Sequence, residues 1–457
     1  MRTKVVPDRR WWIRVVSFFC WMFVANAAAF PAAPGKPQTV ILTHATLFHP
    51  STEQWQKNCT VVMREGRIEA VFHSDSRAHP EDARVIDCTG RYVIPGLIDA
   101  HVHVATDPSG EDNRKQVLKD LAEILREGIT FVRDMGGDAR VLAELQRGAL
   151  TGELAIPDFR YSALMAGPGF MSDDRNLMAT RGVTAGQVPW NLGVTTSTDL
   201  VLAVAEGRGC GASAIKVYAQ IDPPLLSRIV AEAHRQKMAV WSHATVDPSK
   251  PGDAVEAGVD VISHADLLVW EAMPEVNRGP KGLPWRWLDE DVRSIPVDHP
   301  AILSLLRRMK EKGIIFDPTV YISRLMQKTA QEQYPQLKPV ADHRARFAFA
   351  VTRLAHDMGV TVCSGTDAII DRGMSPLASI YRELQVLVEE CGFSPAAALR
   401  AATLNGACAL GIQQTHGSIA PGKAADLVVL AADPTLDIAN CQAVVGVIKA
   451  GRVIRLD

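Results

Sequence analysis

The fold is decided by a pattern that first appears in Glu127-Gly128-Ile129-Thr130-Phe131-Val132, where a glycine precedes a short run of β-branched and aromatic residues. The pattern recurs in residues 257–263, 312–316 and 358–364, each time after a helical stretch. Glycine suits this place because a helix that stops on a left-handed residue can return directly to the sheet. Strands that alternate with amphipathic helices indicate an α/β protein with a parallel sheet and helical crossovers.

The apolar residues between these strands follow the helical period. In residues 225–233 and 302–309 they recur three and four positions apart, which is typical of a helix with one buried face. The alternation of strands and helices extends over residues 93–415. So many units in a stretch of this length predict a closed (β/α)8 TIM-like barrel rather than an open doubly wound sheet.

Both ends of the chain are rich in short strands. Residues 40–94 contain β-branched runs, and the turn Arg64-Glu65-Gly66-Arg67 separates two of them as in a hairpin. A second turn of this kind, Lys449-Ala450-Gly451-Arg452, lies near the C-terminus. We expect residues 30–92 and 416–457 to pair into one small composite β-sandwich domain beside the barrel.

The composition is that of a folded globular protein. The chain has 457 residues, of which 47% are hydrophobic, and its 49 basic and 51 acidic side chains give a formal net charge of −2. This length excludes a single small domain, because one hydrophobic core stops growing at about 250–300 residues. The balanced charge offers no basic face to a phosphate backbone, so no nucleic-acid partner is expected.

The first residues have the order of an export signal. A basic head with Arg2 and Lys4 precedes the apolar run 15–24, and Ala25-Asn26-Ala27 supplies a small-residue cleavage site. This order predicts a cleaved signal peptide over residues 1–29. The alternative is a membrane anchor, which would need roughly 20 apolar residues. We therefore expect an exported protein, periplasmic or secreted, without stable membrane insertion.

The cysteines exclude a disulfide scaffold, because they are scattered and form no C-x-x-C pair. Most are expected to be small buried apolar residues. Three of them lie in the strand-rich ends, where one bridge could form in an oxidising compartment: Cys59, Cys88 and Cys441.

The candidate catalytic residues are concentrated at the ends of the strands. His101 and His103 are two residues apart in Ile98-Asp99-Ala100-His101-Val102-His103, and this spacing points both imidazoles to one face of a strand. One divalent metal can bind both. Barrel sites are assembled from several strand termini at one face, so further ligands are expected at other strand ends. The candidates there are Lys216, His243, His264 and Asp367.

A lone histidine at a strand end is more often a hydrogen-bonded core or rim residue than a ligand. Coincidence at four strand ends is improbable, however, and zinc-type sites use this mixture of nitrogen and oxygen donors. Lys216 is the most informative residue. A buried ammonium is costly and cannot ligate a metal, whereas a carbamate formed from its amine and carbon dioxide could bridge two cations. A lysine that extends to the rim is the alternative.

These residues, within Val93-Ile94-Pro95-Gly96-Leu97-Ile98-Asp99-Ala100-His101-Val102-His103 and Ser364-Gly365-Thr366-Asp367, resemble the amidohydrolase superfamily. The likeness points to its imidazolonepropionase-related branch, which includes metal-dependent, prolidase-like dipeptidases. Residues 401–407 and 417–427 resemble the closing segment of the family. The resemblance implies a (β/α)8 barrel, a composite β-sandwich and a hydrolase with two divalent metal ions, of which zinc is the expected one.

The resemblance also implies a role for each candidate ligand. His101 and His103 would bind the more buried metal, and His243 and His264 the more exposed one. Lys216, as a carboxylated lysine, would bridge the two ions.

Asp367 is the implied catalytic residue. It would hold the first metal, take a proton from the bridging water and pass it to the leaving amine. The implied reaction is hydrolysis of a C–N bond in a small-molecule substrate, a dipeptide or an N-acyl amino acid, by attack of a metal-bridging hydroxide. Two alternatives stay open: a mononuclear hydrolase of a cyclic amide or lactone, and a barrel relative that has lost catalysis. The sequence is also compatible with a homo-oligomer.

Four further residues are predicted to contact the substrate. Tyr218 and Tyr321 could assist the carbonyl, although a packed tyrosine is the more common role. Arg324 and Arg372 lie in loops after the seventh and eighth strands, where a guanidinium could hold a substrate carboxylate. Many members of the branch carry a Gly-Gly-His after the third strand, which residues 163–170 lack.

Overall fold

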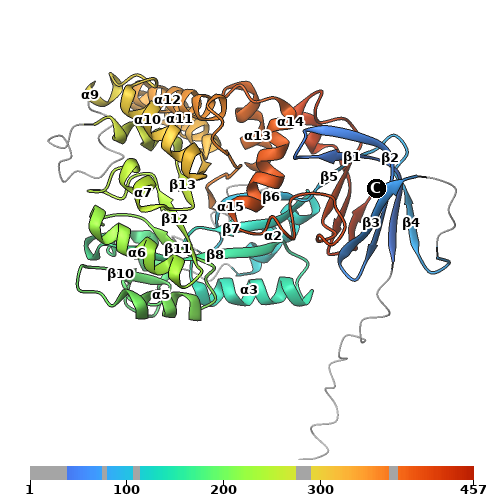
Figure 1. Ribbon diagram of the computed structural model, residues 1–457, viewed down its shortest axis with the longest axis horizontal. Coiled ribbons are helices and arrows are strands. Elements are labelled where there is room, and N and C mark those ends of the chain that lie inside the picture. Colours follow the sequence, from blue (N-terminus) through green and yellow to red (C-terminus); the bar gives the residue numbers. More distant parts are fainter. Residues whose placement is uncertain (1–38, 75–79, 106–113, 274–289, 370–378) are drawn as a thin grey trace, which may run out of the picture.

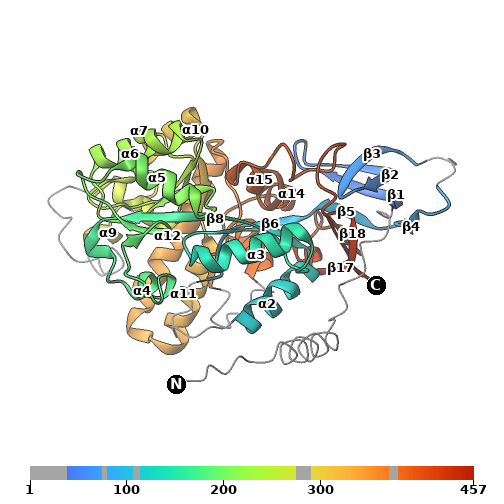
Figure 2. The same ribbon diagram turned by 90° about the horizontal axis from the view of Figure 1, so that it is seen from below.

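The computed structural model describes residues 39–74, 80–105, 114–273, 290–369 and 379–457. Within them the chain forms two bodies that lie side by side, a barrel and a smaller β-domain (Figure 1 and Figure 2). The expected signal peptide, residues 1–29, lies outside the described residues. Among the helices that are described, none combines the length and apolar character needed to cross a membrane.

The barrel is built from parallel strands that are neighbours in the order of the chain. Residues 361–364 close the ring, since Thr361 O accepts a hydrogen bond from Phe316 N (2.8 Å) and Ser364 O accepts one from Ala100 N (2.9 Å). The (β/α)8 barrel predicted from the sequence is thereby confirmed. Its strands are β6 (Leu97–His103), β7 (Ile129–Asp134), β8 (Asp158–Ala166), β11 (Ala214–Val217), β12 (Ala239–His243), β13 (Val261–Ser263), β14 (Ile315–Asp317) and β15 (Ala368–Ile369).

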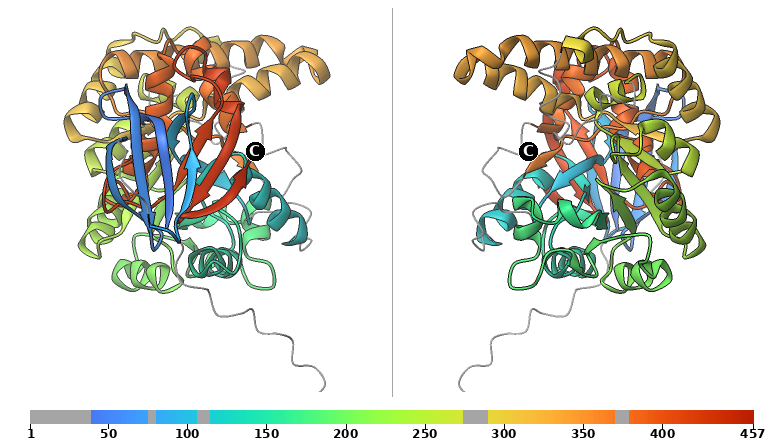
Figure 3. Two further views of the ribbon diagram at one scale, coloured as in Figure 1. Left: turned by 90° about the vertical axis from the view of Figure 1, so that its right-hand side faces the viewer. Right: turned by 90° about the vertical axis from the view of Figure 1, so that its left-hand side faces the viewer.

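Helices surround the barrel, and α11 (Val320–Gln333) and α12 (Lys338–Asp357) project beyond the others (Figure 3). The predicted glycine junctions are present: Gly258 ends α7 (Pro251–Ala257) with a φ of 84°, and Gly313 ends α10 (Pro300–Lys312) with a φ of 70°. The other described α-helices are α2 (Arg114–Arg126), α3 (Ala139–Thr151), α4 (Asp174–Ala179), α5 (Leu200–Gly209), α6 (Pro223–Arg235), α9 (Glu290–Arg293), α13 (Ser379–Glu389), α14 (Pro395–Arg400) and α15 (Gly406–Ala409).

Several short elements lie in the loops of the barrel and beside it. The strands β9 (Gln187–Val188) and β10 (Asn191–Gly193) extend the sheet next to β8. A π-helical turn, η7 (Ala401–Asn405), joins α14 to α15. The 3-10 helices are η1 (Pro168–Phe170), η2 (Ala265–Glu271), η4 (Pro335–Leu337) and η8 (Ile438–Gln442).

Both ends of the chain contribute to the β-domain, whose blue and red strands adjoin in Figure 3. The two halves meet where β5 (Tyr92–Pro95) pairs antiparallel with β16 (Leu427–Leu430), with Val93 opposite Val429. The strands form one eight-stranded sheet, and both halves supply side chains to one apolar core. The strands are β1 (Val40–His49), β2 (Gln54–Arg64), β3 (Arg67–His73), β4 (Arg84–Asp87), β5 (Tyr92–Pro95), β16 (Leu427–Leu430), β17 (Val444–Lys449) and β18 (Arg452–Leu456).

The β-domain is joined to the barrel at the amino-terminal ends of the barrel strands. Gly96 N, directly before β6, donates a hydrogen bond to Asp426 O (2.8 Å). The buried ammonium of Lys449 donates to Asp158, the first residue of β8, and to Asp426 Oδ2 (3.0 Å). This attachment leaves the carboxyl-terminal ends of the strands free for a site.

The cysteines of the described residues are all free thiols. The bridge left open for Cys59, Cys88 and Cys441 does not form, and all three side chains are buried as small apolar groups. The packing of the β-domain therefore rests on its apolar core rather than on a disulfide.

Replacing the buried Lys449 with methionine should weaken the junction of the two bodies. Lys449→Met leaves the carboxylates of Asp158 and Asp426 without their cation, so we expect a loss of about 3 kcal/mol in the free energy of unfolding. Urea denaturation measures this loss. The control Lys312→Met removes the exposed pair with Glu256 (3.0 Å) and should cost less than about 1 kcal/mol. Equal losses in the two variants would contradict the account.

Candidate metal centre

The six predicted ligands come from five strand ends and meet at the carboxyl-terminal end of the barrel. Each sits within a barrel strand or next to one, so the parallel arrangement brings them to the same face. They are His101 and His103 in β6, Lys216 in β11, His243 at the end of β12, His264 directly after β13 and Asp367 directly before β15.

Asp367 lies at the centre of this group. Its Oδ1 is 3.4 Å from His101 Nε2 and 3.2 Å from His103 Nε2, and its Oδ2 is 4.0 Å from His264 Nδ1. The ring of His264 is in turn 4.6 Å from that of His243, measured between centroids. His101, His103 and Asp367 offer donor atoms that all lie within 4.8 Å of one another, close enough to hold one metal ion.

The backbone is strained at two of these residues. Asp367 and His264 have φ values of 55° and 79°, in a region that residues with a Cβ seldom adopt. The amide of Asp367 donates to His101 O (2.8 Å), which fixes the carboxylate beside β6. Strain that neighbouring contacts maintain in this way is common where side chains must be aimed at a ligand.

Three of the histidines use Nδ1 for contacts with the protein, and no hydrogen bond to their Nε2 atoms is found among the described residues. Nδ1 of His101 donates to Asp317 Oδ2 (2.7 Å) and that of His243 to Thr245 O (3.0 Å), while that of His264 lies 3.0 Å from Thr319 Oγ1. Such outer contacts orient the imidazoles of metal sites.

Burial keeps these three imidazoles neutral. It lowers the pKa of His101 and His264, and it lowers the pKa of His243 to about 3, with the neighbouring Lys216 as a second cause. A neutral imidazole is the form that binds a metal.

Lys216 is buried at 1% exposure, and its Nζ has no hydrogen-bond partner among the described residues. Burial lowers its pKa to about 7, although Asp317 and Asp367 oppose this shift. The side chain does not extend to the rim, so the alternative of an exposed lysine does not hold. With a pKa of about 7, this amine loses its charge near neutral pH, next to two carboxylates and three histidines.

Asp317, the last residue of β14, was not predicted as part of the site. Its Oδ2 accepts hydrogen bonds from His101, from Arg133 Nη2 (2.9 Å) and from Ser263 Oγ (2.9 Å). Burial alone would raise its pKa, but His101 and Arg133 keep it below the ordinary value. Asp317 is therefore a buried carboxylate that orients His101. One feature of the sequence could have pointed to such a residue. Arg133 is a charged side chain inside the apolar strand β7, so it needs a buried acidic partner, and that partner is Asp317.

Residues 360–367, the segment that leads into β15 and is called the eighth strand segment below, pass very close to these residues. A Cβ on Gly365 would lie 2.4 Å from Asp317 Oδ1 and 2.7 Å from His101 Cβ, so only glycine fits. The next residue, Thr366, donates from its hydroxyl to Asp99 Oδ2 (2.8 Å) and from its amide to Asp99 Oδ1 (3.0 Å). These contacts fix the position of Asp367 against β6.

Tyr218 extends the site outward from His243. Its ring is 4.4 Å from the His243 ring and is stacked on Phe170 at 4.7 Å between centroids. Its hydroxyl accepts a hydrogen bond from Arg175 Nη1 (3.0 Å). Sequence reasoning missed Arg175, because it stands in the polar segment after β8 among other charged residues.

The other predicted substrate residues lie elsewhere. Tyr321 is half-buried in the first turn of α11, next to the segment that carries Thr319. Arg324 is not brought to the group: its guanidinium pairs with Glu390 and lies 4.9 Å from the centroid of the Phe349 ring. Arg372 lies outside the described residues.

A second group of donor atoms is found at the junction with the β-domain, where Asp158, His416 and Asp426 offer atoms within 4.8 Å of one another. Lys449 already supplies the cation there, so this group needs no metal.

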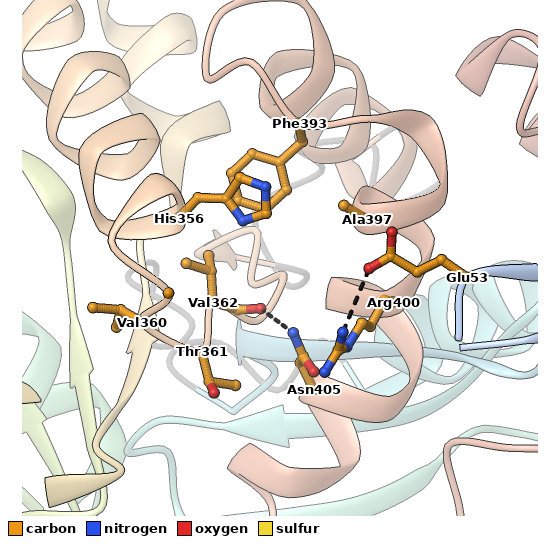
Figure 4. A pocket seen from close by; sticks show the side chains of 10 residues that line it. Glu53, His356, Val360, Thr361, Val362, Phe393, Ala397, Arg400 and Asn405 are labelled. Atoms are coloured by element: carbon orange, nitrogen blue, oxygen red, sulfur yellow. Dashed lines mark hydrogen bonds and ion pairs between the residues drawn. The ribbon is translucent and has the colours of Figure 1, made fainter. Parts of the chain in front are cut away.

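A cavity of about 180 Å³ is lined by residues other than the candidate ligands (Figure 4). Its lining includes Val360 and Val362, at the beginning of the eighth strand segment, whereas Asp367 ends that segment. Arg400 and Glu53, 3.5 Å apart, connect the barrel to the β-domain beside it. The cavity is therefore separate from the candidate metal centre.

Comparison with known proteins identifies one family. The model of the amidohydrolase family matches residues 92–454. Ochratoxinase from Aspergillus niger is 25% identical to this chain, over 91% of the chain and 87% of that enzyme. Imidazolonepropionase from Deinococcus radiodurans is 26% identical, over 82% of the chain and 86% of that enzyme.

Solved structures agree with the fold. A Xaa-Pro dipeptidase with methionine in its active site superposes with a TM-score of 0.73 at 22% identity, covering 91% of this chain and 99% of that one. Molinate hydrolase superposes with a TM-score of 0.70 at 20% identity, covering 92% of this chain and 95% of that one. At these identities the likeness establishes the architecture alone.

The buried amine of Lys216 should make stability depend on pH. Without metal or carbon dioxide, the unfolded chain keeps its proton up to about pH 10.5, whereas the folded chain loses it above about pH 7. Between these values the unfolded state binds more protons, so stability should rise with pH through this group by up to about 1.4 kcal/mol per pH unit. Urea denaturation at several pH values measures the slope.

Lys216→Met should reduce that slope, and the exposed control Lys115→Met should leave it unchanged. An identical slope in wild type and Lys216→Met would contradict a buried neutral amine.

Proposed function

The chain belongs to the amidohydrolase family, and we propose that it is a metal-dependent hydrolase whose substrate is a dipeptide or an N-acyl amino acid. The family hydrolyses C–N bonds of small molecules and is generally metal-dependent, so the reaction class follows from membership. The observation that carries the proposed metal centre is the amine of Lys216, which is buried among three histidines and two carboxylates and has no hydrogen-bond partner in the described part of the chain.

The residues fit a pair of divalent ions. One ion would be held by His101, His103 and Asp367, and the other by His243 and His264. Neutral imidazoles and a carboxylate are the donors that zinc accepts, which supports zinc as the metal. When bound, such a pair supplies Lewis acidity, which lowers the pKa of water toward neutrality and polarises a carbonyl.

Lys216 fits the centre as a carbamate. The lone pair of its neutral Nζ would attack the carbon of carbon dioxide. An N–C bond forms, one C=O π bond opens and leaves its electron pair on oxygen, and one proton leaves to solvent. The product is an anion with two oxygen donors, so a costly buried amine would become a group that could hold both ions. Its position next to Asp367, His243 and His264, with which it interacts electrostatically, supports this role.

Asp367 is proposed as the group that moves protons. Burial alone would raise its pKa, but His101 and His103 lower it overall, so the side chain is a carboxylate at neutral pH. Its side chain is 23% exposed, enough to meet a substrate. We propose that its carboxylate accepts a proton from the attacking water and delivers it to the leaving nitrogen.

Tyr218 is proposed to donate a hydrogen bond to the substrate carbonyl. Burial raises the pKa of its phenol, so it keeps its proton at neutral pH. The hydroxyl accepts from Arg175, which leaves its own proton available to another acceptor. A donor placed here would stabilise the negative charge that develops on the carbonyl oxygen during attack.

The mononuclear hydrolase of a cyclic amide or lactone is kept as the second candidate. It is favoured by the compact donor set of His101, His103 and Asp367, which by itself could hold one ion. Lys216 separates the two candidates, because a mononuclear ring-opening enzyme has no need of a carboxylated lysine. Metal analysis that finds two ions per chain supports the first candidate, and one ion the second.

Changing Asp367 should stop the reaction without emptying the site. Asp367→Asn retains an oxygen donor but cannot take up a proton, so kcat should fall by about 10²–10⁴-fold. Metal content, measured beside the rate, should stay near that of the wild type. The exposed control Asp357→Asn should keep full activity. Substantial hydrolysis by Asp367→Asn at full metal occupancy would remove the assignment.

Metal removal should abolish hydrolysis. Exhaustive chelation is expected to stop turnover of a dipeptide and N-acyl amino acid library, and zinc with bicarbonate should restore it. After equilibration with ¹³C-bicarbonate, NMR of the wild-type protein should show a carbamate carbon that is missing from Lys216→Met. Hydrolysis that continues after exhaustive chelation would contradict the proposal.

A further inference from the structure

Two aromatic rings and one guanidinium lie beside the candidate metal centre, those of Phe170, Tyr218 and Arg175. After β8 the chain forms η1 and α4, which carry Phe170 and Arg175. The Phe170 ring is nearly parallel to that of Tyr218, at 15°, and Tyr218 in turn contacts His243. The guanidinium carbon of Arg175 is 5.4 Å from the Tyr218 ring centroid. A ligand held at His243 therefore lies near a fixed cation.

Arg175 is fixed in place but not saturated. Its Nε and Nη2 donate to the two carboxylate oxygens of Asp173 (2.8 and 3.0 Å), and its Nη1 donates to the Tyr218 hydroxyl. A guanidinium has five N–H donors, so these three hydrogen bonds leave two for a ligand. The side chain is 49% exposed and its pKa is raised by Asp173, so it is a charged donor that solvent and ligands can reach.

Another arginine, Arg140, shares the acidic partner and the exposure of Arg175, so these two features alone do not indicate a binding site. Arg140 pairs with Asp138 in the same way, two residues apart at the start of a helix, and its side chain is 48% exposed. It lies over Trp190 rather than against Tyr218. The acidic partner is therefore a common helix-start arrangement. What distinguishes Arg175 is the contact that joins it to the candidate metal centre through Tyr218.

We infer that Arg175 binds the carboxylate of the substrate and restricts the enzyme to substrates that carry it on the carbon next to the scissile nitrogen. This inference rests on the proposed function. In the proposed function, the Tyr218 hydroxyl donates a hydrogen bond to the carbonyl oxygen of the substrate. Arg175 Nη1 lies 3.0 Å from that hydroxyl. In a dipeptide or an N-acyl α-amino acid, the carboxylate is within about 5 Å of the scissile carbonyl. A guanidinium recognises a carboxylate through paired, charge-assisted hydrogen bonds. An ammonium group would be repelled from this place.

The test compares acids with their matching amides. N-acetyl amino acids with the twenty side chains, and the corresponding C-terminal amides, are titrated against metal-loaded protein by calorimetry, and their hydrolysis is followed in parallel. Wild type should bind the best acid about 10- to 100-fold more tightly than its amide, the range expected for charge-assisted hydrogen bonds. Arg175→Met should lose this preference while its affinity for the amide stays within threefold. Arg175→Lys should retain only part of it.

Two variants serve as controls. Arg140→Met removes the matched arginine and should leave the acid preference intact. Tyr218→Phe should lower kcat for acid and amide alike, because the carbonyl is common to both. Metal content of each variant shows that the centre itself is retained.

The outcomes separate the inference from the proposed function. Acid preference without any hydrolysis would contradict the proposed function and leave the carboxylate site in place. Hydrolysis of acid and amide with equal kcat/KM by the wild type would overturn the inference. An equal fall in kcat for both substrates in Arg175→Met, with the acid preference kept, would also overturn it, because Arg175 would then only position Tyr218.

Discussion

The site depends on one constraint, an amine that is buried inside the barrel and has no hydrogen-bond partner among the residues that the structure describes. Lys216 is 1% exposed, and a charged ammonium at such a place costs several kcal/mol unless it is paired. The pKa falls to about 7 in response, so the group is held near the point where it loses its charge. In the proposed function, carboxylation removes this cost, because the carbamate would be stabilised by two cations. The proposed carboxylation thus accounts for a lysine, otherwise an unfavourable residue, in an apolar strand.

The barrel meets this constraint by placing the compensating groups on different strands. Asp317 lies at the end of β14 and accepts hydrogen bonds from both His101 and Arg133. A carboxylate and a guanidinium therefore neutralise each other next to the amine of Lys216. Asp367 is held by backbone contact with β6 in a strained conformation. Because the β-domain attaches at the opposite ends of the strands, this face stays accessible to a small molecule.

Local patterns predict most of the fold and the central part of the site. Helix and strand periods differ, so the alternation of the two reveals the barrel, and the period of two in a strand places His101 and His103 on one face. Asp317 could not be found in this way, because it contacts a histidine 216 residues earlier through the register of neighbouring strands. Arg324 does follow the seventh strand as predicted, but packing against Glu390 and Phe349 turns its guanidinium toward the outer helices. Orientation of this kind is set by tertiary contacts that a local pattern does not contain.

In the proposed function, a pair of divalent ions is held by six side chains from five strand ends, one of which is the carboxylated Lys216. Anomalous diffraction from zinc-soaked crystals grown with bicarbonate would show these ions. Two anomalous peaks are expected among His101, His103, His243, His264 and Asp367, with electron density that extends from Lys216 Nζ to both. An unmodified Lys216 with no peak beside it, or zinc bound only at Asp158, His416 and Asp426, would contradict a two-metal centre.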